Sequence, residues 1–178
     1  DIGELCIPVN VTIEDRMPEP FEEIQTLDNF AKMAMHDFRK AFLLYTNEKF
    51  ISLLKGKNNK YIPLYRGLSE NPVTYQHLEE FLIASGKKER ISISADKKEK
   101  LSYVLGSTIK DTMYIYKSTW GYAHIEVSVK GDFIEVNKRS ITSDDFIGRV
   151  YGLEFILNRD RLCGRKCRGR IILKTVYE

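Results

Sequence analysis

The period of the hydrophobic residues changes along the chain, and this change limits the folds that are open to it. Between residues 21 and 54 apolar side chains recur every three or four positions, which is typical of amphipathic helices. Residues 122–129 and 170–176 have instead the character of strands. The helical stripe consists of Phe21, Ile24, Leu27, Phe30, Ala31, Ala34, Met35, Phe38, Ala41 and Phe42.

The other segments follow from their periods and turn residues. Helices are predicted over 21–45, from Glu48 to Leu54, from about residue 75 to a stop at Gly86, and over 95–105. Strands are predicted over 61–65, 89–94, 114–116, 122–129, 132–136, 153–157 and 170–176, with a hairpin turn at Lys130-Gly131 and a polar loop over 140–152. Because helices cluster early and strands late, we predict an α+β fold: N-terminal helices followed by a mainly antiparallel, split β-sheet core.

The length of 178 residues suits one domain, and we predict an N-terminal arm or linker over 1–20 and a single domain over 21–178. No run of about eighteen apolar residues is present, so no membrane span is predicted. The net charge of +3 is too small to indicate nucleic-acid binding by itself. Six basic residues nevertheless lie within 159–170, either in a solvated turn or at a contact to an anionic target.

The cysteines do not predict a metal site. Cys163 and Cys167 are four positions apart and no histidine lies nearby, so a zinc site lacks ligands. Cys6 is the third cysteine, and a disulfide from it to either of the other two stays open at this stage.

Three short motifs occur in a fixed order. Leu64-Tyr65-Arg66-Gly67 places an arginine at the end of a predicted strand. Ile91-Ser92-Ile93-Ser94 is a predicted strand with two serines on one face, and Tyr151-Gly152-Leu153-Glu154 leads into a late apolar strand. Together the motifs resemble the mono-ADP-ribosyltransferases of the arginine–serine–glutamate class, found in bacterial toxins, effectors and phage proteins. The resemblance covers about residues 21–178.

This resemblance implies NAD as co-substrate and an ADP-ribosyltransferase-like fold. Glu154 would stabilise the positive charge that develops on the ribose as the nicotinamide bond breaks. Arg66 would bind the pyrophosphate with its guanidinium, and Gly67 would leave room for the nicotinamide amide. Ser92, with Ser94 beside it, would hold the ribose region of NAD.

Acceptor recognition is assigned to the polar loop 140–152 and to Phe146, an apolar residue in a solvated stretch. Relatives that modify arginine usually carry a glutamate two positions before the catalytic one, and this chain has Gly152 there. The resemblance therefore implies transfer of ADP-ribose to a macromolecular acceptor at a site other than arginine. A protein acceptor is favoured over nucleic acid.

The resemblance further implies a monomeric protein that is secreted as a toxin or effector, with a cytoplasmic enzyme as the alternative. Two other functions stay open at the level of sequence. One is NAD hydrolysis, or NAD binding by a degenerate relative. The other belongs to a different class: a non-enzymatic α+β module that binds nucleic acid through the late basic residues.

Overall fold

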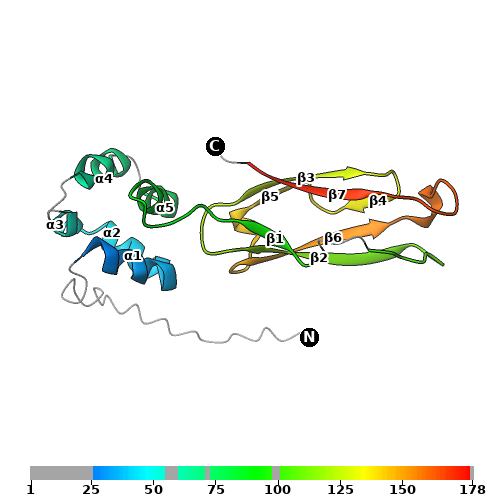
Figure 1. Cartoon of the computed structure of the whole chain (residues 1–178), viewed down its shortest axis with the longest axis horizontal. Coiled ribbons are helices and arrows are strands. Elements are labelled where there is room, and N and C mark those ends of the chain that lie inside the picture. The colour runs from blue at the N-terminus through cyan, green and yellow to red at the C-terminus, as the bar shows by residue number, and fades with distance from the viewer. Residues whose placement is uncertain (1–25, 55–59, 71–72, 98–100, 177–178) are drawn as a thin grey trace, which may run out of the picture.

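The computed structural model describes residues 26–54, 60–70, 73–97 and 101–176. Its helices gather at one end of an elongated molecule and its strands at the other (Figure 1). The elements are α1 (Leu27–His36), α2 (Phe38–Tyr45), α3 (Phe50–Leu54), α4 (Tyr61–Ser69), α5 (Tyr75–Ala84), β1 (Ile93–Ala95), β2 (Ile109–Lys117), β3 (His124–Lys130), β4 (Ile134–Val136), β5 (Ser140–Thr142), η1 (Ser143–Asp145), β6 (Val150–Leu157), η2 (Arg159–Arg161) and β7 (Arg170–Thr175). The predicted α+β class, with helices first and strands after them, is confirmed.

The helical part is built around a cluster of buried aromatic rings. Tyr45, Phe50, Tyr65 and Phe81 contact one another with centroid separations from 5.0 to 6.2 Å. Each ring comes from a different helix, so the cluster ties α2, α3, α4 and α5 together. Asp37 divides the predicted long first helix, because its carboxylate accepts a hydrogen bond from the Lys40 amide and caps α2.

The strand predicted over 61–65 is wrong: the segment is helix α4. Pro63 falls in the first turn, where its missing N–H removes no helical hydrogen bond. Tyr61, Tyr65 and Leu68 are spaced as one face of a helix; Tyr65 is buried in the helical core, and the partly buried Tyr61 and Leu68 pack against it. The buried Tyr65 hydroxyl also donates to the Tyr45 carbonyl at 2.9 Å, so tertiary packing supports the helix.

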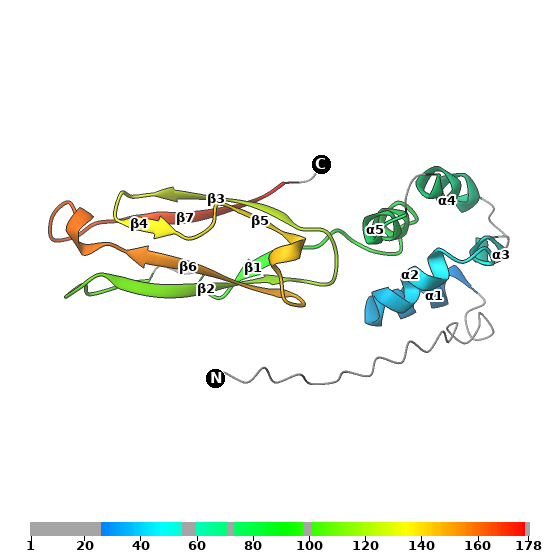
Figure 2. The same cartoon turned by 180° about the vertical axis from the view of Figure 1, so that it is seen from behind.

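The strands form two antiparallel sheets that pack face to face as a β-sandwich (Figure 2). The first sheet has the order β1-β2-β6-β4 and the second the order β5-β3-β7. The longest pairing joins β2 to β6, with Ile109 opposite Leu157 and Tyr116 opposite Val150. Ile115, Ile125, Ile141 and Leu153 are fully buried between the sheets.

Most of the predicted strands are present, but their connections differ from the prediction. Gly131 forms the expected turn with a φ of +120°, yet β3 and β4 belong to different sheets, so the turn crosses the sandwich and does not close a hairpin. The helix predicted over 95–105 is wrong in its described part. Ala95 ends β1, and residues 96, 97 and 101–105 are not helical.

The predicted polar loop 140–152 is largely structured. It contains β5, the single turn η1 and the first residues of β6. Phe146, predicted at the exposed tip, is instead buried, with its ring near Tyr151 and beneath the Lys117 ammonium. Ile147 is the exposed apolar residue of this segment, with 89% of its surface accessible. Phe146 turns inward because it completes the end of the sandwich core.

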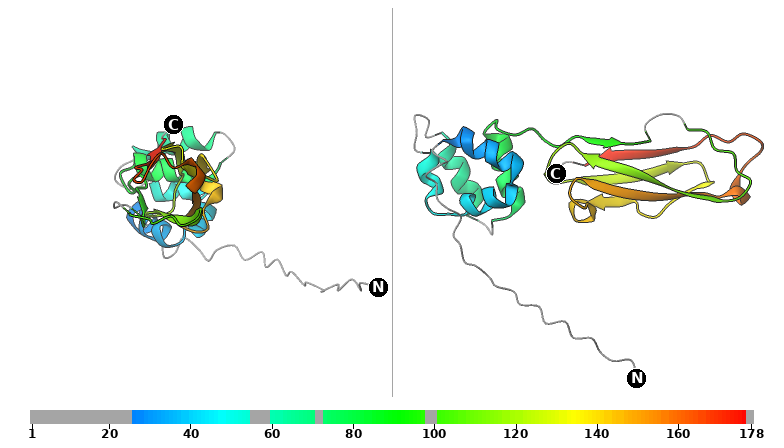
Figure 3. Two further views of the ribbon diagram at one scale, coloured as in Figure 1. Left: turned by 90° about the vertical axis from the view of Figure 1, so that its right-hand side faces the viewer. Right: turned by 90° about the horizontal axis from the view of Figure 1, so that it is seen from below.

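The buried apolar residues form two clusters, one among the helices and one between the sheets. Trp120, from the loop between β2 and β3, bridges the two parts by stacking on Phe38 of α2 at 5.2 Å. Seen along the molecule, the helices and the sandwich lie one behind the other (Figure 3).

None of the helices in the described ranges combines the length and the apolar character that a membrane span requires.

Candidate functional site

The structure separates the predicted NAD-binding residues. Arg66 lies in the last turn of α4 with an exposed side chain, whereas Glu154 lies on β6 in the sandwich. Figures 1 and 2 agree that α4 and β6 are in different parts of the molecule. Gly67 follows Arg66 in the last turn of α4, and no atom lies within 4 Å of where its Cβ would be. The missing side chain of Gly67 therefore does not make room for any neighbouring group in this conformation.

Ser94, Gly152 and Glu154 do share a surface, the outer face of the first sheet. Ser94 pairs with Tyr116 on β2, and Glu154 pairs with Thr112 four residues further along the same strand. With strands about 4.8 Å apart and a rise of about 3.3 Å per residue, the backbones of Ser94 and Glu154 are roughly 16 Å apart. The Glu154 carboxylate forms an exposed ion pair with Lys110 at 3.4 Å.

Ser92 lies just before β1 and is exposed. Its amide donates to the Ser118 hydroxyl at 2.9 Å, and its carbonyl accepts from the Ser118 amide at 2.9 Å. Ser92 and Ser94 also line a groove of about 480 Å³ along the side of the sandwich. The serines thus lie beside a hollow, but Glu154 and Arg66 do not line it.

The densest charge lies on the loop between β6 and β7, at the end of the sandwich farthest from the helices (Figure 1). Residues 158–170 carry six basic side chains and one acidic side chain, Asp160. Four of the basic residues are exposed and make no ion pair in the described part of the chain; we call them the basic tip: Arg165, Lys166, Arg168 and Arg170.

The base of this loop is held by several contacts. The Asn158 amide donates to the Phe133 carbonyl at 2.7 Å, and the Asn158 side chain caps η2 by accepting from the Asp160 amide at 3.0 Å. The Arg159 amide donates to the Thr108 hydroxyl at 3.2 Å. These bonds tie the loop to both neighbouring turns, so the basic tip projects from a fixed base.

A glycine fixes the return of the loop to β7. A Cβ at Gly169 would lie 2.4 Å from Ile134 Cδ1 and 2.8 Å from the Lys130 carbonyl oxygen, so no larger residue fits without a shift. Gly164 supplies the turn itself, with a φ of +106°. The two glycines therefore bend the loop and press its second half against the turn that follows β3.

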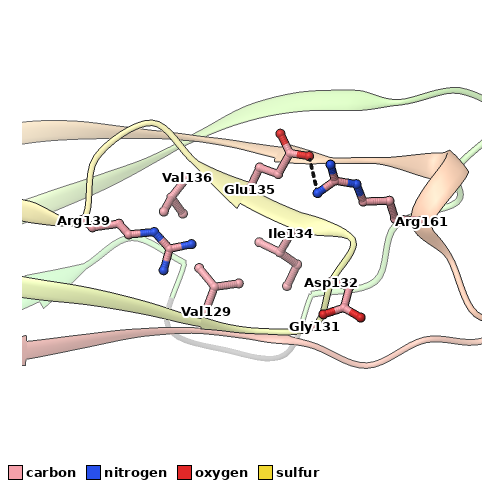
Figure 4. A pocket seen from close by; sticks show the side chains of 8 residues that line it. All are labelled: Val129, Gly131, Asp132, Ile134, Glu135, Val136, Arg139 and Arg161. Atoms are coloured by element: carbon pink, nitrogen blue, oxygen red, sulfur yellow. Dashed lines mark ion pairs between the residues drawn. The ribbon is translucent and has the colours of Figure 1, made fainter.

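A pocket of about 770 Å³ opens beside the base of the loop (Figure 4). One wall carries an ion pair in which the Arg161 guanidinium lies 3.0 Å from the Glu135 carboxylate. Arg139 lies on the opposite side of the pocket, and Asp132 lies near its rim (Figure 4). Since its charges are of both signs, the pocket lacks the uniform positive field of the basic tip.

The basic residues are evident from the sequence, but the polar cluster that joins the two parts of the molecule is not. This junction cluster consists of Glu79, Lys88, Lys117, Trp120 and Gly121. The Lys88 ammonium donates to Glu79 at 2.8 Å and lies 4.9 Å from the Trp120 ring centre. Lys117 donates to the Gly121 carbonyl at 3.1 Å, and burial lowers the pKa of its ammonium.

No motif indicates this cluster, because its lysines and glutamate come from α5, the loop after it and β2. From the sequence, charged residues at these positions would be expected on the solvated surface. In the fold, the contact between the two parts of the molecule buries them. The cluster is structural in its geometry: each of its charged groups contacts another member, and it faces no cavity among those found at the sandwich.

Neither the cysteines nor the carboxylates gather into a metal site in the ranges described. No group of three or more histidine, cysteine, aspartate or glutamate residues is close enough there to hold an ion. Cys163 and Cys167 are free thiols on the loop that bears the basic tip. Cys6, and with it the question of a disulfide to either cysteine, lies outside the described residues.

Comparison with known families gives one match. A family model described as the N-terminal part of a family of unknown function, DUF5717, matches residues 1–178. The chain belongs to this family. No match was found among curated proteins or among solved structures. Membership in DUF5717 shows the family of the chain.

Proposed function

We propose that this DUF5717 domain is a binding module that docks on the phosphate backbone of nucleic acid through the basic tip. The observation that carries the proposal is a group of four exposed cations, three on one projecting loop and Arg170 at the start of β7, which make no ion pair with the described residues. Exposed cations that neutralise phosphates release condensed counterions, and this release supplies most of the free energy of non-specific binding.

The composition of the loop favours contact with the backbone over base readout. Residues 158–170 contain no aromatic side chain, so the loop offers no ring on which an unpaired base could stack. It is also neither a helix nor a two-stranded ribbon, the elements that enter the major groove. Arginine forks suit phosphate oxygens, and three of the four cations are arginines.

The experiment measures binding of a fluorescent DNA duplex by anisotropy at low salt. The tip variant carries R165Q, K166Q and R168Q. The control variant, K32Q, K40Q and K49Q, removes the same charge from exposed lysines of the helical part. We expect at least a tenfold loss of affinity in the tip variant and less than a threefold loss in the control. Equal losses in the two variants would show that only net charge matters and would contradict the assignment.

NAD-dependent mono-ADP-ribosyl transfer is the second candidate function, and different observations support it. It is supported by the order of the three motifs and by the position of Ser92 and Ser94 beside a groove. In this proposal the finer fold is ADP-ribosyltransferase-like, and Arg66 would have to reach the NAD from the helical part. NAD hydrolysis without transfer follows from the same chemistry.

Release of nicotinamide from NAD tests this second candidate. If the activity is present, Glu154→Gln should reduce turnover about a hundredfold or more, as expected for loss of one transition-state stabiliser. Glu126→Gln, an exposed glutamate on β3, is the matched control. Absence of nicotinamide release from the unmodified protein would remove the enzymatic proposal and leave the binding module unaffected.

A further inference from the structure

Among the residues that the structure describes, the outer edge of β7 is an open strand edge. In the second sheet β7 pairs with β3 alone, and no other described strand lies against it. The Val176 amide donates to the His124 carbonyl at 2.9 Å, which fixes the register of the hydrogen bonds. In an antiparallel pair the bonded residues alternate, so Ile171, Leu173 and Thr175 direct their N–H and C=O groups away from β3.

The same edge borders an apolar groove, which we call the seam groove. It is the hollow of about 480 Å³ between β1 of one sheet and β7 of the other, lined by Ile91, Ser92, Ile93, Ser94, Ala95, Leu173 and Thr175. The side chains of Leu173 and Thr175 therefore border the groove from the strand whose unpaired backbone groups run along it. An extended segment placed here would gain both backbone hydrogen bonds and apolar contact.

The chain itself contains a segment with the required pattern. From Leu5 to Ile13 every second residue is apolar, namely Leu5, Ile7, Val9, Val11 and Ile13, and the residues between them are Cys6, Pro8, Asn10 and Thr12. Large aliphatic residues at every second position are typical of a strand with one buried face. Pro8 is the fourth residue of the segment, and an added strand at the edge of a sheet tolerates the loss of one N–H.

The charges that flank the segment agree with this pairing. The segment is flanked by acidic residues, Glu4 on one side and Glu14 and Asp15 on the other. The exposed face of β7 carries Arg170 and Lys174, so either direction of the added strand brings a carboxylate near a cation. Thirteen residues separate Ile13 from Leu27, the start of α1, and can span at most about 45 Å.

We propose that residues 5–13 of this chain add as a strand to the edge of β7 and fill the seam groove with their odd-numbered side chains. A tethered segment acts at a high effective concentration, which favours it over a segment from a second copy. This inference does not depend on the proposed nucleic-acid contact.

Hydrogen exchange of the full-length protein, measured residue by residue by NMR, tests the pairing. Wild-type amides of Ile171, Leu173 and Thr175 are expected to be protected. In the variant V9D/V11D they should exchange at least ten times faster. The control variant N10D/T12D adds the same charge on the opposite face of the segment and should retain the protection. A synthetic peptide of residues 5–15 should restore it in V9D/V11D.

Other outcomes overturn the proposal. Unprotected amides at Ile171, Leu173 and Thr175 in the wild-type protein would do so without any variant. Equal rates in wild type and V9D/V11D would show that another segment covers the edge. Protection that rises with protein concentration, together with a dimer mass by light scattering, would assign the groove to a second copy. Amides of β2 and β6 serve as the internal reference for folding in each sample.

Discussion

The carboxylate of Glu79 on α5 accepts a hydrogen bond from the backbone amide of Tyr122, which precedes β3, at 2.9 Å. Its second oxygen accepts from Lys88 at 2.8 Å, and the side chains of both residues are almost completely buried. One carboxylate therefore joins the helical part to the sandwich and neutralises a buried lysine.

Glu79→Gln should lower the free energy of unfolding by about 3 kcal/mol, because it leaves the Lys88 ammonium buried without its counter-charge. The amide oxygen of glutamine can still accept the hydrogen bond from the Tyr122 amide. The loss of stability therefore measures the effect of removing the negative charge of Glu79. Chemical denaturation measures it. Glu80→Gln is the control: Glu80 pairs with Arg90 at the surface and its loss should cost less than about 1 kcal/mol. Similar losses in the two variants would contradict the role given to Glu79.

Gly121→Ala should also be strongly destabilising. A Cβ at this position would lie 1.9 Å from a carboxylate oxygen of Glu79, and the φ of +152° is unfavourable for other residues. We expect a loss of about 2 kcal/mol or more in a thermal or denaturant unfolding experiment, from backbone strain and the displaced ion pair. Gly164→Ala is the comparison, since its φ is +106° but no atom lies within 4 Å of the added Cβ. A smaller loss for Gly121→Ala than for Gly164→Ala would argue against the packing described at the junction.

Gly67→Ala is expected to stabilise the protein. Gly67 lies within α4 and has open space around its Cβ position, so alanine should gain about 0.5–1 kcal/mol from helix propensity alone. The melting temperature measures this. A decrease would contradict the helical conformation of this segment and favour the strand that its alternating residues predict.

Asp145 makes the stability of the sandwich sensitive to acid. Its carboxylate bonds to Lys138 and to the Thr142 amide, and these hydrogen bonds hold the pKa of Asp145 below its ordinary value. A lowered pKa in the folded state stabilises the protein above the unfolded-state pKa of about 3.9, and this contribution is lost as the pH falls further. Asp145→Asn should therefore lower the melting temperature at pH 7, with the difference shrinking below about pH 4. A pH-independent difference would contradict this, and Asp144→Asn provides the control.

The order of helices and strands could be predicted because a long segment repeats the spacing of its apolar residues many times. The helix from 75 and the strands at 122–129 and 170–176 lie close to where the structure has them. The segment 61–65 was ambiguous, because Tyr61 and Tyr65 fit both an alternating strand and one face of a helix. The contact of Tyr65 with Tyr45, made twenty residues away, decides between them and is invisible in a short window.

The candidate sites also differ in whether they could be predicted from the sequence. The basic tip could be predicted, because its residues are neighbours in the sequence. The junction cluster could not, because its members meet only after folding. The proposed grouping of Arg66, Ser92 and Glu154 assumed a strand at Arg66, and helix α4 places that residue in the other part of the molecule.

The salt dependence of duplex binding tests the central claim most directly. For binding to B-DNA, the logarithm of the affinity falls with the logarithm of salt concentration by about 0.9 for each neutralised phosphate. Four contacts from the basic tip predict a slope of about −3.6 for the wild-type protein, and one remaining contact predicts about −0.9 for R165Q/K166Q/R168Q. The same steep slope in both proteins, or a wild-type slope near zero, would contradict the account.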